Sequence, residues 1–354
     1  MGSTYGENIK LNIFGSSHGP EIGMTLEGIP AGLPVDIEQL QQFLNRRAPG
    51  RNPWSTGRTE GDVPHFLSGI TDGRTNGSTI RAIIYNENVR KSDYIALANT
   101  PRPGHADYTA WVKYGPEFDM SGGGPFSGRM TAPMCIAGGL CKQWLEARGI
   151  RIGAHILAIG PISDHCFDPL SPQFNVVAQD FPVVDATIAS EMIRCILAAK
   201  DGGDSVGGRI ECAAIGVPAG MGGPMFGSVK AKIASILYAI PAVREVSFGH
   251  DTEFLGSANN DAYTIQDGRV CTQTNNCGGI LGGITNGMPL ITRVSVKPTP
   301  SIARPQQSVN LMTMEEVTVQ VNGRHDPCIV PRAVPVVEAA TAIALFDLIL
   351  GEGA

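Results

Sequence analysis

The chain has 354 residues, a net charge of −6 and an isoelectric point near 5.7. This acidic balance argues against nonspecific nucleic-acid binding, which depends on a broad basic surface, so we expect no nucleic-acid partner. With 42% hydrophobic and 17% charged residues, the composition is typical of a globular protein with a substantial core.

Five segments have the apolar spacing of helices, and seven have the β-branched or alternating pattern of strands. Asp36 and Gln39 resemble a capping box at the start of the first helix, and Thr131 is the expected cap of the second. The predicted helices span 36–48, 131–149, 186–200, 228–240 and 333–350. The predicted strands span about 9–14, 21–28, 79–85, 151–160, 208–217, 290–297 and 315–321.

The strands and helices are interspersed without a Pro- or Ser-rich linker, which predicts one compact domain of residues 1–354. The last predicted helix is apolar nearly all round, as is typical of a helix buried between layers. Its apolar run contains Glu338 and Asp347, so we expect no membrane span.

Two short sequences recur in the same order in both halves of the chain. Gly28-Ile-Pro-Ala-Gly32 reappears as Gly216-Val-Pro-Ala-Gly220, and Gly69-Ile-Thr-Asp-Gly73 reappears as Gly283-Ile-Thr-Asn-Gly287. Each half then continues into a loop with arginine, histidine and aspartate. We interpret this pattern as an ancient duplication with pseudo-twofold halves; chance matches among short glycine motifs are the alternative.

Two of these loops, Arg102-Pro-Gly-His105-Ala-Asp107 and Gly323-Arg324-His325-Asp326-Pro327-Cys328, combine arginine, histidine and a carboxylate. Arginine offers a charged planar fork to phosphate or carboxylate, and histidine titrates near neutrality, so both loops suit acid–base chemistry on an anion. His18 lies in a third turn, bounded by glycines. The alternative in each case is a structural histidine or a surface ion pair of little energetic value.

Arginines are concentrated in parts of this acidic chain, at Arg46, Arg47, Arg51, Arg58, Arg102, Arg129 and Arg324. A small anion with several charges explains them, because phosphate and carboxylate prefer bidentate guanidinium contacts. The alternative is that the first few only complement a helix dipole. The glycine-rich loop 121–129 offers N–H groups to an anion but matches no nucleotide motif. Eight cysteines without a C-x-x-C pair or a signal-peptide pattern predict reduced thiols in the cytoplasm and no metal site.

Taken in order, these segments resemble the chorismate synthase family, from about residue 15 to residue 350. The motifs that carry the resemblance are Gly15-Ser-Ser-His-Gly19, Arg46-Arg-Ala-Pro-Gly50, Arg102-Pro-Gly-His-Ala-Asp107-Tyr108, Gly278-Gly-Ile-Leu-Gly-Gly283, Lys297-Pro-Thr-Pro-Ser301 and Gly323-Arg-His-Asp-Pro-Cys328. The resemblance implies conversion of 5-enolpyruvylshikimate 3-phosphate to chorismate and phosphate by 1,4-elimination, with reduced FMN that is required but not consumed. It also implies an α+β fold, described as a β-α-β sandwich with helices between antiparallel sheets, and a homotetramer.

The resemblance further implies roles for individual residues. His18 would protonate or stabilise the reduced flavin near N1, His105 would protonate the leaving phosphate, and Asp326 would assist proton removal near flavin N5. The substrate would contact Arg46, Arg47, Arg51, Arg102, Ser127, Arg129 and Arg324. The flavin would contact Pro125, Phe126, Ser127, Ala258, Asn259, Gly282, Lys297, Pro298, Thr299, Pro300, Ser301 and Arg324.

The chain departs from the family's usual pattern at Ser16, Ala48, Pro53, Pro125 and Phe126. Two other classes of function remain open at this point, a flavin-dependent oxidoreductase and a non-catalytic anion-binding protein. The sequence also leaves open whether the protein reduces its own flavin with reduced NADP or depends on a separate flavin reductase.

Overall fold

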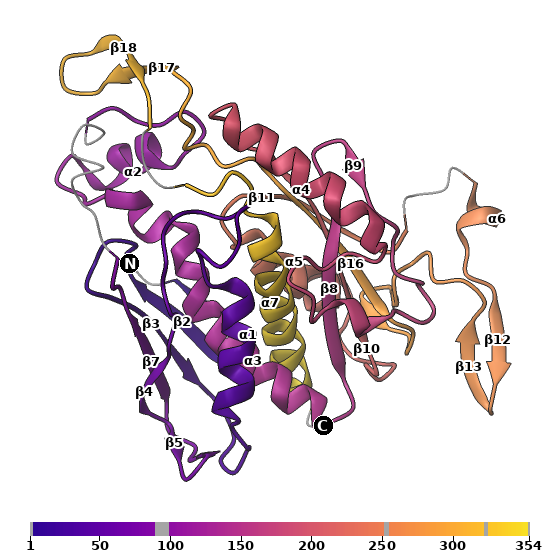
Figure 1. Cartoon of the computed structure of the whole chain (residues 1–354). Helices are drawn as coiled ribbons and strands as arrows, with labels where there is room; N and C mark the ends of the chain where they lie inside the picture. Colours follow the sequence, from indigo (N-terminus) through magenta and orange to yellow (C-terminus); the bar gives the residue numbers. More distant parts are fainter. Residues whose placement is uncertain (1–2, 89–98, 251–254, 322–324, 353–354) are drawn as a thin grey trace.

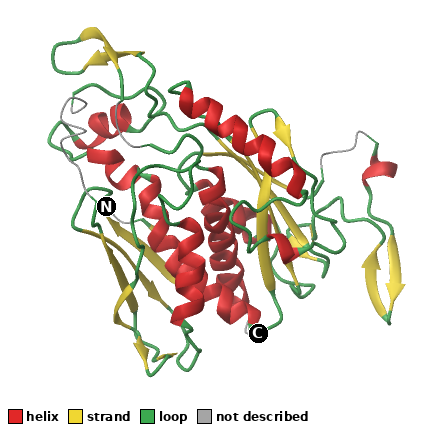
Figure 2. Ribbon diagram, viewed as in Figure 1, coloured by secondary structure: helices red, strands yellow, loops and turns green. Residues whose placement is uncertain are grey.

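The computed structural model describes residues 3–88, 99–250, 255–321 and 325–352. Two five-stranded antiparallel sheets are its largest elements, and helices lie between them (Figures 1 and 2). This mixture of helices and antiparallel sheets confirms the α+β class.

The two sheets have the following strands, in order across each sheet. The first contains β1 (Thr4–Tyr5), β2 (Lys10–Gly15), β3 (Glu21–Glu27), β7 (Ile80–Tyr85) and β4 (His65–Ser68). The second contains β9 (Ile162–Ser163), β8 (Arg151–Ile159), β10 (Gly208–Ile215), β16 (Leu290–Val296) and β11 (Val243–Phe248). Separate hairpins are formed by β5 (Ile70–Thr71) with β6 (Arg74–Thr75), β12 (Tyr263–Gln266) with β13 (Arg269–Thr272), β14 (Ile280–Leu281) with β15 (Ile284–Thr285), and β17 (Gln306–Asn310) with β18 (Glu315–Val319).

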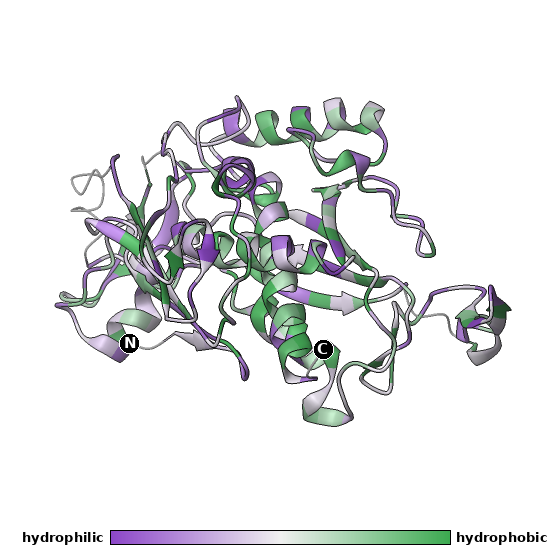
Figure 3. Cartoon of the chain, turned by 90° about the horizontal axis from the view of Figure 1, so that it is seen from below, coloured by the Kyte–Doolittle hydropathy of each residue, from purple (hydrophilic) through white to green (hydrophobic). Residues whose placement is uncertain are grey.

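Three helices, α1 (Ile37–Arg47), α3 (Thr131–Glu146) and α7 (Val330–Gly351), lie between the two sheets (Figure 1). The remaining helices are α2 (Asp107–Tyr114), α4 (Ala186–Asp201), α5 (Val229–Tyr238) and α6 (Gly256–Asn259). Of these, α5 packs against α7, and α4 contacts β8 and β9. Figures 1 and 3 show that α6 and the β12–β13 hairpin project away from both sheets.

Local signals explain where α1 begins but not where α3 begins. The carboxylate of Asp36 accepts a hydrogen bond from the N–H of Gln39 at 2.9 Å, as predicted. The reciprocal half of the capping box is absent, because the N–H of Asp36 donates to Gln143 instead. The prediction that Thr131 caps α3 is wrong: its hydroxyl donates to the carbonyl of Gly128 at 2.6 Å and makes no cap.

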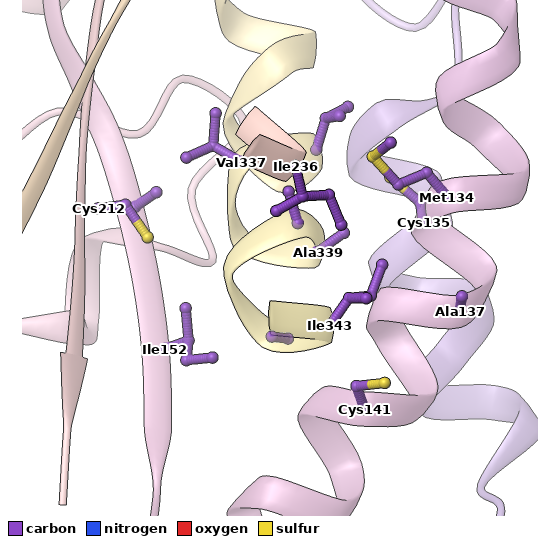
Figure 4. Packing of buried hydrophobic residues seen from close by; sticks show 14 of the residues in the cluster. Met134, Cys135, Ala137, Cys141, Ile152, Cys212, Ile236, Val337, Ala339 and Ile343 are labelled. Carbon is purple, nitrogen blue, oxygen red and sulfur yellow. The ribbon is translucent and has the colours of Figure 1, made fainter. Parts of the chain in front are cut away.

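The core is centred on the contact between α3 and α7 (Figure 4). A Cβ atom at Gly138 would lie 2.3 Å from the Cβ of Ala339, so only glycine allows the two helices to approach this closely. By length and composition α7 is apolar enough to cross a membrane, yet 94% of its apolar stretch is buried inside the fold. The expectation of a helix buried between layers is therefore confirmed.

The second sequence echo is out of register in the structure, because the residue that matches Thr285 is Thr75, four positions beyond Thr71 of the echo. The first echo forms matching turns of the two sheets. In the first turn, the N–H of Gly32 donates to the carbonyl of Thr75 at 2.7 Å; in the second turn, the N–H of Gly220 donates to the carbonyl of Thr285 at 2.8 Å. Each threonine hydroxyl also donates to the proline carbonyl of its turn, at 2.6 Å in both cases. Both turns follow the central strand of their sheet, β3 or β10.

Candidate active site

One cavity of about 1070 Å³ gathers residues from distant parts of the chain. It is lined by the turn between β2 and β3, the start of α2, the loop before α3, the turn after β16 and the start of α7. The expected site residues that line it are His18, Arg47, Arg102, His105, Pro125, Phe126, Ser127, Arg129, Lys297, Thr299, Pro300, Ser301 and Asp326. The structure therefore brings the three expected catalytic side chains to one hollow.

Other expected residues lie elsewhere. Arg46 donates to the carboxylate of Glu338 at 2.9 and 2.7 Å, and Lys142 contacts the same carboxylate at 2.5 Å. Arg46 and Arg51 line a separate cavity of about 510 Å³. Since Glu338 neutralises Arg46 inside the helix layer, this arginine is not placed to hold a ligand in the larger cavity. Four more residues are outside the lining of the larger cavity, namely Ala258, Asn259, Gly282 and Pro298, and Arg324 lies outside the described residues.

His105 is oriented by a carboxylate. Its Nδ1 lies 2.7 Å from Oδ1 of Asp107, and Arg102 donates to the same carboxylate from Nε and Nη2, at 2.7 and 2.8 Å. Burial alone raises the pKa of Asp107, but the hydrogen bonds from Arg102 and His105 outweigh it and hold that pKa well below its usual range. An ionised Asp107 favours a proton on Nδ1, which leaves Nε2 of His105 to exchange protons with a ligand.

Three successive glycines hold the backbone of the loop before α3 against both histidines. Gly122, Gly123 and Gly124 have φ values of 62°, 93° and 52°, which L side chains rarely adopt. A Cβ at Gly122 would lie 2.0 Å from Nδ1 of His18, and one at Gly123 would lie 3.0 Å from Nε2 of His105. The loop therefore excludes side chains here and fixes the positions of both imidazoles.

Arg129 is a buried donor at the cavity, with 5% of its surface exposed. Its Nε donates to Oδ1 of Asn86 at 3.0 Å, and its Nη1 pairs with Asp62. Its Nη2 has no hydrogen-bond partner among the residues that the structure describes, and it forms a long ion pair with Glu60, whose carboxylate oxygen is 3.8 Å away. A buried donor without a hydrogen bond lowers the stability of the fold unless a ligand accepts a hydrogen bond from it.

Asp326 is held by three partners from two segments. One carboxylate oxygen accepts from the hydroxyl of Ser55 at 3.1 Å and from the N–H of Thr56 at 2.9 Å. The other oxygen pairs with Arg332, in the first turn of α7, and Arg332 also donates to the carbonyl of Arg47 at 2.9 Å. The carboxylate therefore has a fixed orientation at the cavity wall.

The cavity also has an aromatic side and a polar side. The rings of Tyr114 and Phe118 are 4.8 Å apart, and those of Tyr114 and Phe126 are 6.4 Å apart. On the polar side, Nζ of Lys297 donates to the carbonyl of Gly104 at 2.5 Å. The buried hydroxyl of Thr299 has no hydrogen-bond partner in the described part of the chain. Flat and polar surfaces that meet in one hollow suit a ligand with a planar ring and anionic groups.

Sequence reasoning missed several residues that shape this site. The sequence indicates Asp107 only as a nearby charge and assigns no role to Glu60, Asp62 and Arg332. The alternation of Arg58, Glu60 and Asp62 is a local signal that could have drawn attention to this segment. No local signal marks Arg332, because its contact with Asp326 depends on where α7 begins.

Comparison with known proteins identifies the family. Residues 9–350 match the family model described as chorismate synthase. A chorismate synthase of Lancefieldella parvula is 46% identical over 98% of this chain and 96% of its own length, and one of Thermococcus kodakarensis is 44% identical over 98% and 97%. A crystal structure of chorismate synthase matches with a TM-score of 0.78 at 27% identity, covering 98% of this chain and 93% of that one. On its sequence and on its fold, the chain belongs to the chorismate synthase family.

Proposed function

We propose that this cavity converts 5-enolpyruvylshikimate 3-phosphate to chorismate and phosphate, the reaction of the family to which the chain belongs. The observation that carries the proposal is the meeting of His18, His105 and Asp326 at one cavity. The reaction is a 1,4-elimination that removes the 3-phosphate and a hydrogen from C6, so it requires both anion binding and proton transfer. Arginines on the cavity wall supply the anion binding. The imidazoles of His18 and His105 and the carboxylate of Asp326 supply the proton transfer.

The anionic groups of the substrate would be held mainly by Arg129. Arg129 presents the unsatisfied Nη2, and Ser127 lies on the same loop. Arg47 and Arg102 add positive charge nearby, while the three guanidinium nitrogens of each already bind protein atoms. Arg46 and Arg51 do not enter the proposal, because they line the other cavity.

The proton transfers are assigned by position and by partner. His105 would protonate the departing phosphate, because Asp107 stabilises its imidazolium until the proton is given up. His18 would donate a hydrogen bond to the N1 edge of the reduced flavin. Asp326 would assist removal of the C6 proton, with Arg332 holding the carboxylate in place.

The residues present fit a reduced FMN. The cavity of about 1070 Å³ is at the upper end of the range for sites that take one small ligand, so it has room for substrate and flavin together. The aromatic side suits a planar ring system, and Lys297 with the orphaned hydroxyl of Thr299 suits the polar groups. When bound, reduced FMN supplies electron density that eases departure of the phosphate. The flavin regains this electron density as the hydrogen leaves, so there is no net redox change.

An anaerobic assay with chemically reduced FMN tests this function. Chorismate and phosphate should appear while the flavin absorbance shows no net oxidation. Consumption of reduced NADP coupled to flavin turnover without chorismate would favour a flavin-dependent oxidoreductase instead. Tight binding of the substrate without turnover would favour an anion-binding protein.

We also propose that the fold is a single-domain β-α-β sandwich built from two pseudo-twofold halves. Support comes from the matching bonds of Gly32 and Gly220 to Thr75 and Thr285, and from the matching strand orders around β3 and β10. A superposition of residues 21–47 on residues 209–240 that fails to align strand, turn and helix would contradict it.

A homotetramer would account for the expected flavin contacts that lie outside the cavity. Ala258 is on α6, which projects from the sheets as β12 does (Figure 1). The side chains of Tyr263 and Ile265 on β12 are exposed. A neighbouring copy could therefore bring Ala258 and Asn259 to a flavin. Mass measurement by light scattering at several concentrations tests the assembly. A cytoplasmic location is supported by cysteines that are all free thiols, since disulfides are rare in reducing compartments.

A further inference from the structure

Asp62 joins two arginines of the cavity. Its Oδ2 accepts from Nη1 of Arg47 at 2.9 Å, and its Oδ1 accepts from Nη1 of Arg129. The residue is 2% exposed, and its φ of 49° lies in the left-handed region that non-glycine residues rarely adopt. Strain of this kind persists where surrounding contacts fix the backbone, and it is common at functional sites.

Neutral partners hold the same two guanidinium groups from other directions. Arg47 donates from Nε to the hydroxyl of Thr131 at 3.2 Å and from Nη2 to the carbonyl of Gly128 at 2.9 Å. Arg129 donates from Nε to Asn86 at 3.0 Å. The Nη2 atom of Arg129 lies 3.8 Å from a carboxylate oxygen of Glu60 and makes no hydrogen bond to the described residues, so it can bind a ligand. The contact between Nη1 and Asp62 sets the direction in which Nη2 points.

The charges of the two arginines need a shared counter-ion. Burial lowers the pKa of Arg129, and the nearby charge of Arg47 lowers it further, while Asp62 opposes both effects. Burial alone raises the pKa of Asp62, but Arg47 and Arg129 outweigh it and hold that pKa below its usual range. The carboxylate is therefore ionised at neutral pH, and it lets two like charges lie side by side.

We propose that Asp62 is a positioning residue for substrate binding: it holds Arg47 and Arg129 together so that Nη2 of Arg129 meets an anionic group of the substrate. This inference rests on the proposed function, because it takes Arg129 as a substrate contact. It assigns Asp62 no contact with the substrate.

The direction of the KM change in Asp62→Asn shows whether Asp62 acts by positioning the arginines or only by its charge. Asp62→Asn makes the site one unit more positive, so electrostatic attraction alone would tighten binding of a polyanionic substrate. If Asp62 acts by position, the amide lets the two guanidinium groups separate, and binding weakens although the site is more positive. The two explanations therefore predict KM changes of opposite direction.

The experiment measures kcat and KM for 5-enolpyruvylshikimate 3-phosphate with reduced FMN. We expect Asp62→Asn to raise KM roughly 10- to 100-fold with a smaller change in kcat, in line with the cost of misplacing a binding group. The matched control is Asp72→Asn, because Asp72 has the same φ of 49° but is exposed in the β5–β6 hairpin. The control should keep both constants of the wild type. An unchanged or lower KM in Asp62→Asn overturns the inference.

Two further variants separate the possible failures. Asp62→Glu keeps the charge and displaces the carboxylate, so it should also raise KM, and it replaces Asp62→Asn if that variant does not fold. An unchanged KM in Asp62→Glu overturns the inference as well. Arg129→Lys should raise KM if Arg129 contacts the substrate. An unchanged KM in Arg129→Lys would mean that the proposed site is wrong. A raised KM in Arg129→Lys together with a wild-type KM in the Asp62 variants would mean that only the role of Asp62 is wrong.

Discussion

The Nδ1 atom of His105 lies 2.7 Å from Oδ1 of Asp107, so the charge of the imidazole is linked to a carboxylate two residues along the chain. We expect Asp107→Asn to lower kcat roughly 10²- to 10⁴-fold, the usual effect of losing a general acid. The amide neither fixes the proton on Nδ1 nor stabilises the imidazolium.

The control for this variant is Glu117→Gln, an exposed carboxylate just beyond the end of α2, which should behave as wild type. His105→Ala should lose a similar factor in kcat. Because the two residues act as one unit, adding Asp107→Asn to His105→Ala should cost little more. A wild-type kcat for Asp107→Asn would show that the pair is only structural.

Gly122 tests the contact between the glycine-rich loop and His18. Gly122→Ala places a Cβ 2.0 Å from Nδ1 of His18 at a backbone φ of 62°, so both the ring and the backbone must move. We expect a loss of about 1–3 kcal/mol in the free energy of unfolding and a clear loss of turnover. Urea denaturation and the chorismate assay measure the two effects.

Gly128→Ala is the matched control in the same loop. Its new methyl group would meet no atom within 4 Å, and the backbone there is not left-handed. Its free energy of unfolding should be close to that of the wild type. Equal losses in the two variants would mean that the whole loop, and not the position of His18, is sensitive to added side chains.

Apolar periodicity is local, which is why each predicted helix and strand is found within about three residues of its expected bounds. The eight-residue α2 and the strand β11, whose sequence Val-Arg-Glu-Val-Ser-Phe mixes charged and apolar residues, carry weaker signals and were missed. Motifs located His18 and His105 for the same local reason. No local pattern could pair Asp62 with Arg129.

Arg46 and Arg47, both expected to contact the substrate, line different cavities for a geometric reason. Consecutive residues on an α-helix point about 100° apart, so neighbours in sequence face different surroundings. Arg46 reaches Glu338 in the helix layer, and Arg47 reaches Asp62 beside the cavity. A cluster of charges in sequence is therefore not a cluster in space, and only the packing of α1 against α3 and α7 separates the two.

Glu338 is a carboxylate that should contribute strongly to stability. It is fully buried in α7, and although burial raises its pKa, Arg46 and Lys142 lower it to about 2. Glu338→Gln leaves two partly buried cations without their counter-ion, so we expect a loss of about 3–5 kcal/mol in the free energy of unfolding. Urea denaturation at neutral pH measures it.

The exposed pair of Glu191 with Arg194, 3.9 Å apart, provides the contrast. Glu191→Gln should cost less than about 1 kcal/mol, because exposed pairs contribute little. Since the pKa of Glu338 is depressed on folding, its contribution is complete above the ordinary glutamate pKa and is lost as pH falls toward 2. A Glu338→Gln variant as stable as Glu191→Gln would contradict the role of the buried triad.

His155 should make stability fall as pH rises. The ring is fully buried, with Nε2 3.1 Å from Glu211 and Nδ1 3.6 Å from Asp164, while Arg293 contacts Glu211 from the next strand. Burial disfavours the charged ring, but the two carboxylates outweigh it and hold the pKa of His155 above its usual value. Its stabilising contribution is therefore complete below about pH 6.5, the ordinary histidine pKa, and is lost as pH rises through the raised value.

Urea denaturation of wild type and His155→Gln between pH 6 and pH 9 measures this contribution. The wild type should lose up to about 1.4 kcal/mol per pH unit within the titration range of His155, and the variant should lack that slope. His165→Gln is the control, because His165 is exposed ten residues along the chain and should keep the wild-type slope. The same slope in His155→Gln as in the wild type would mean that the buried ring is neutral, and that Glu211 depends on Arg293 alone for its counter-charge.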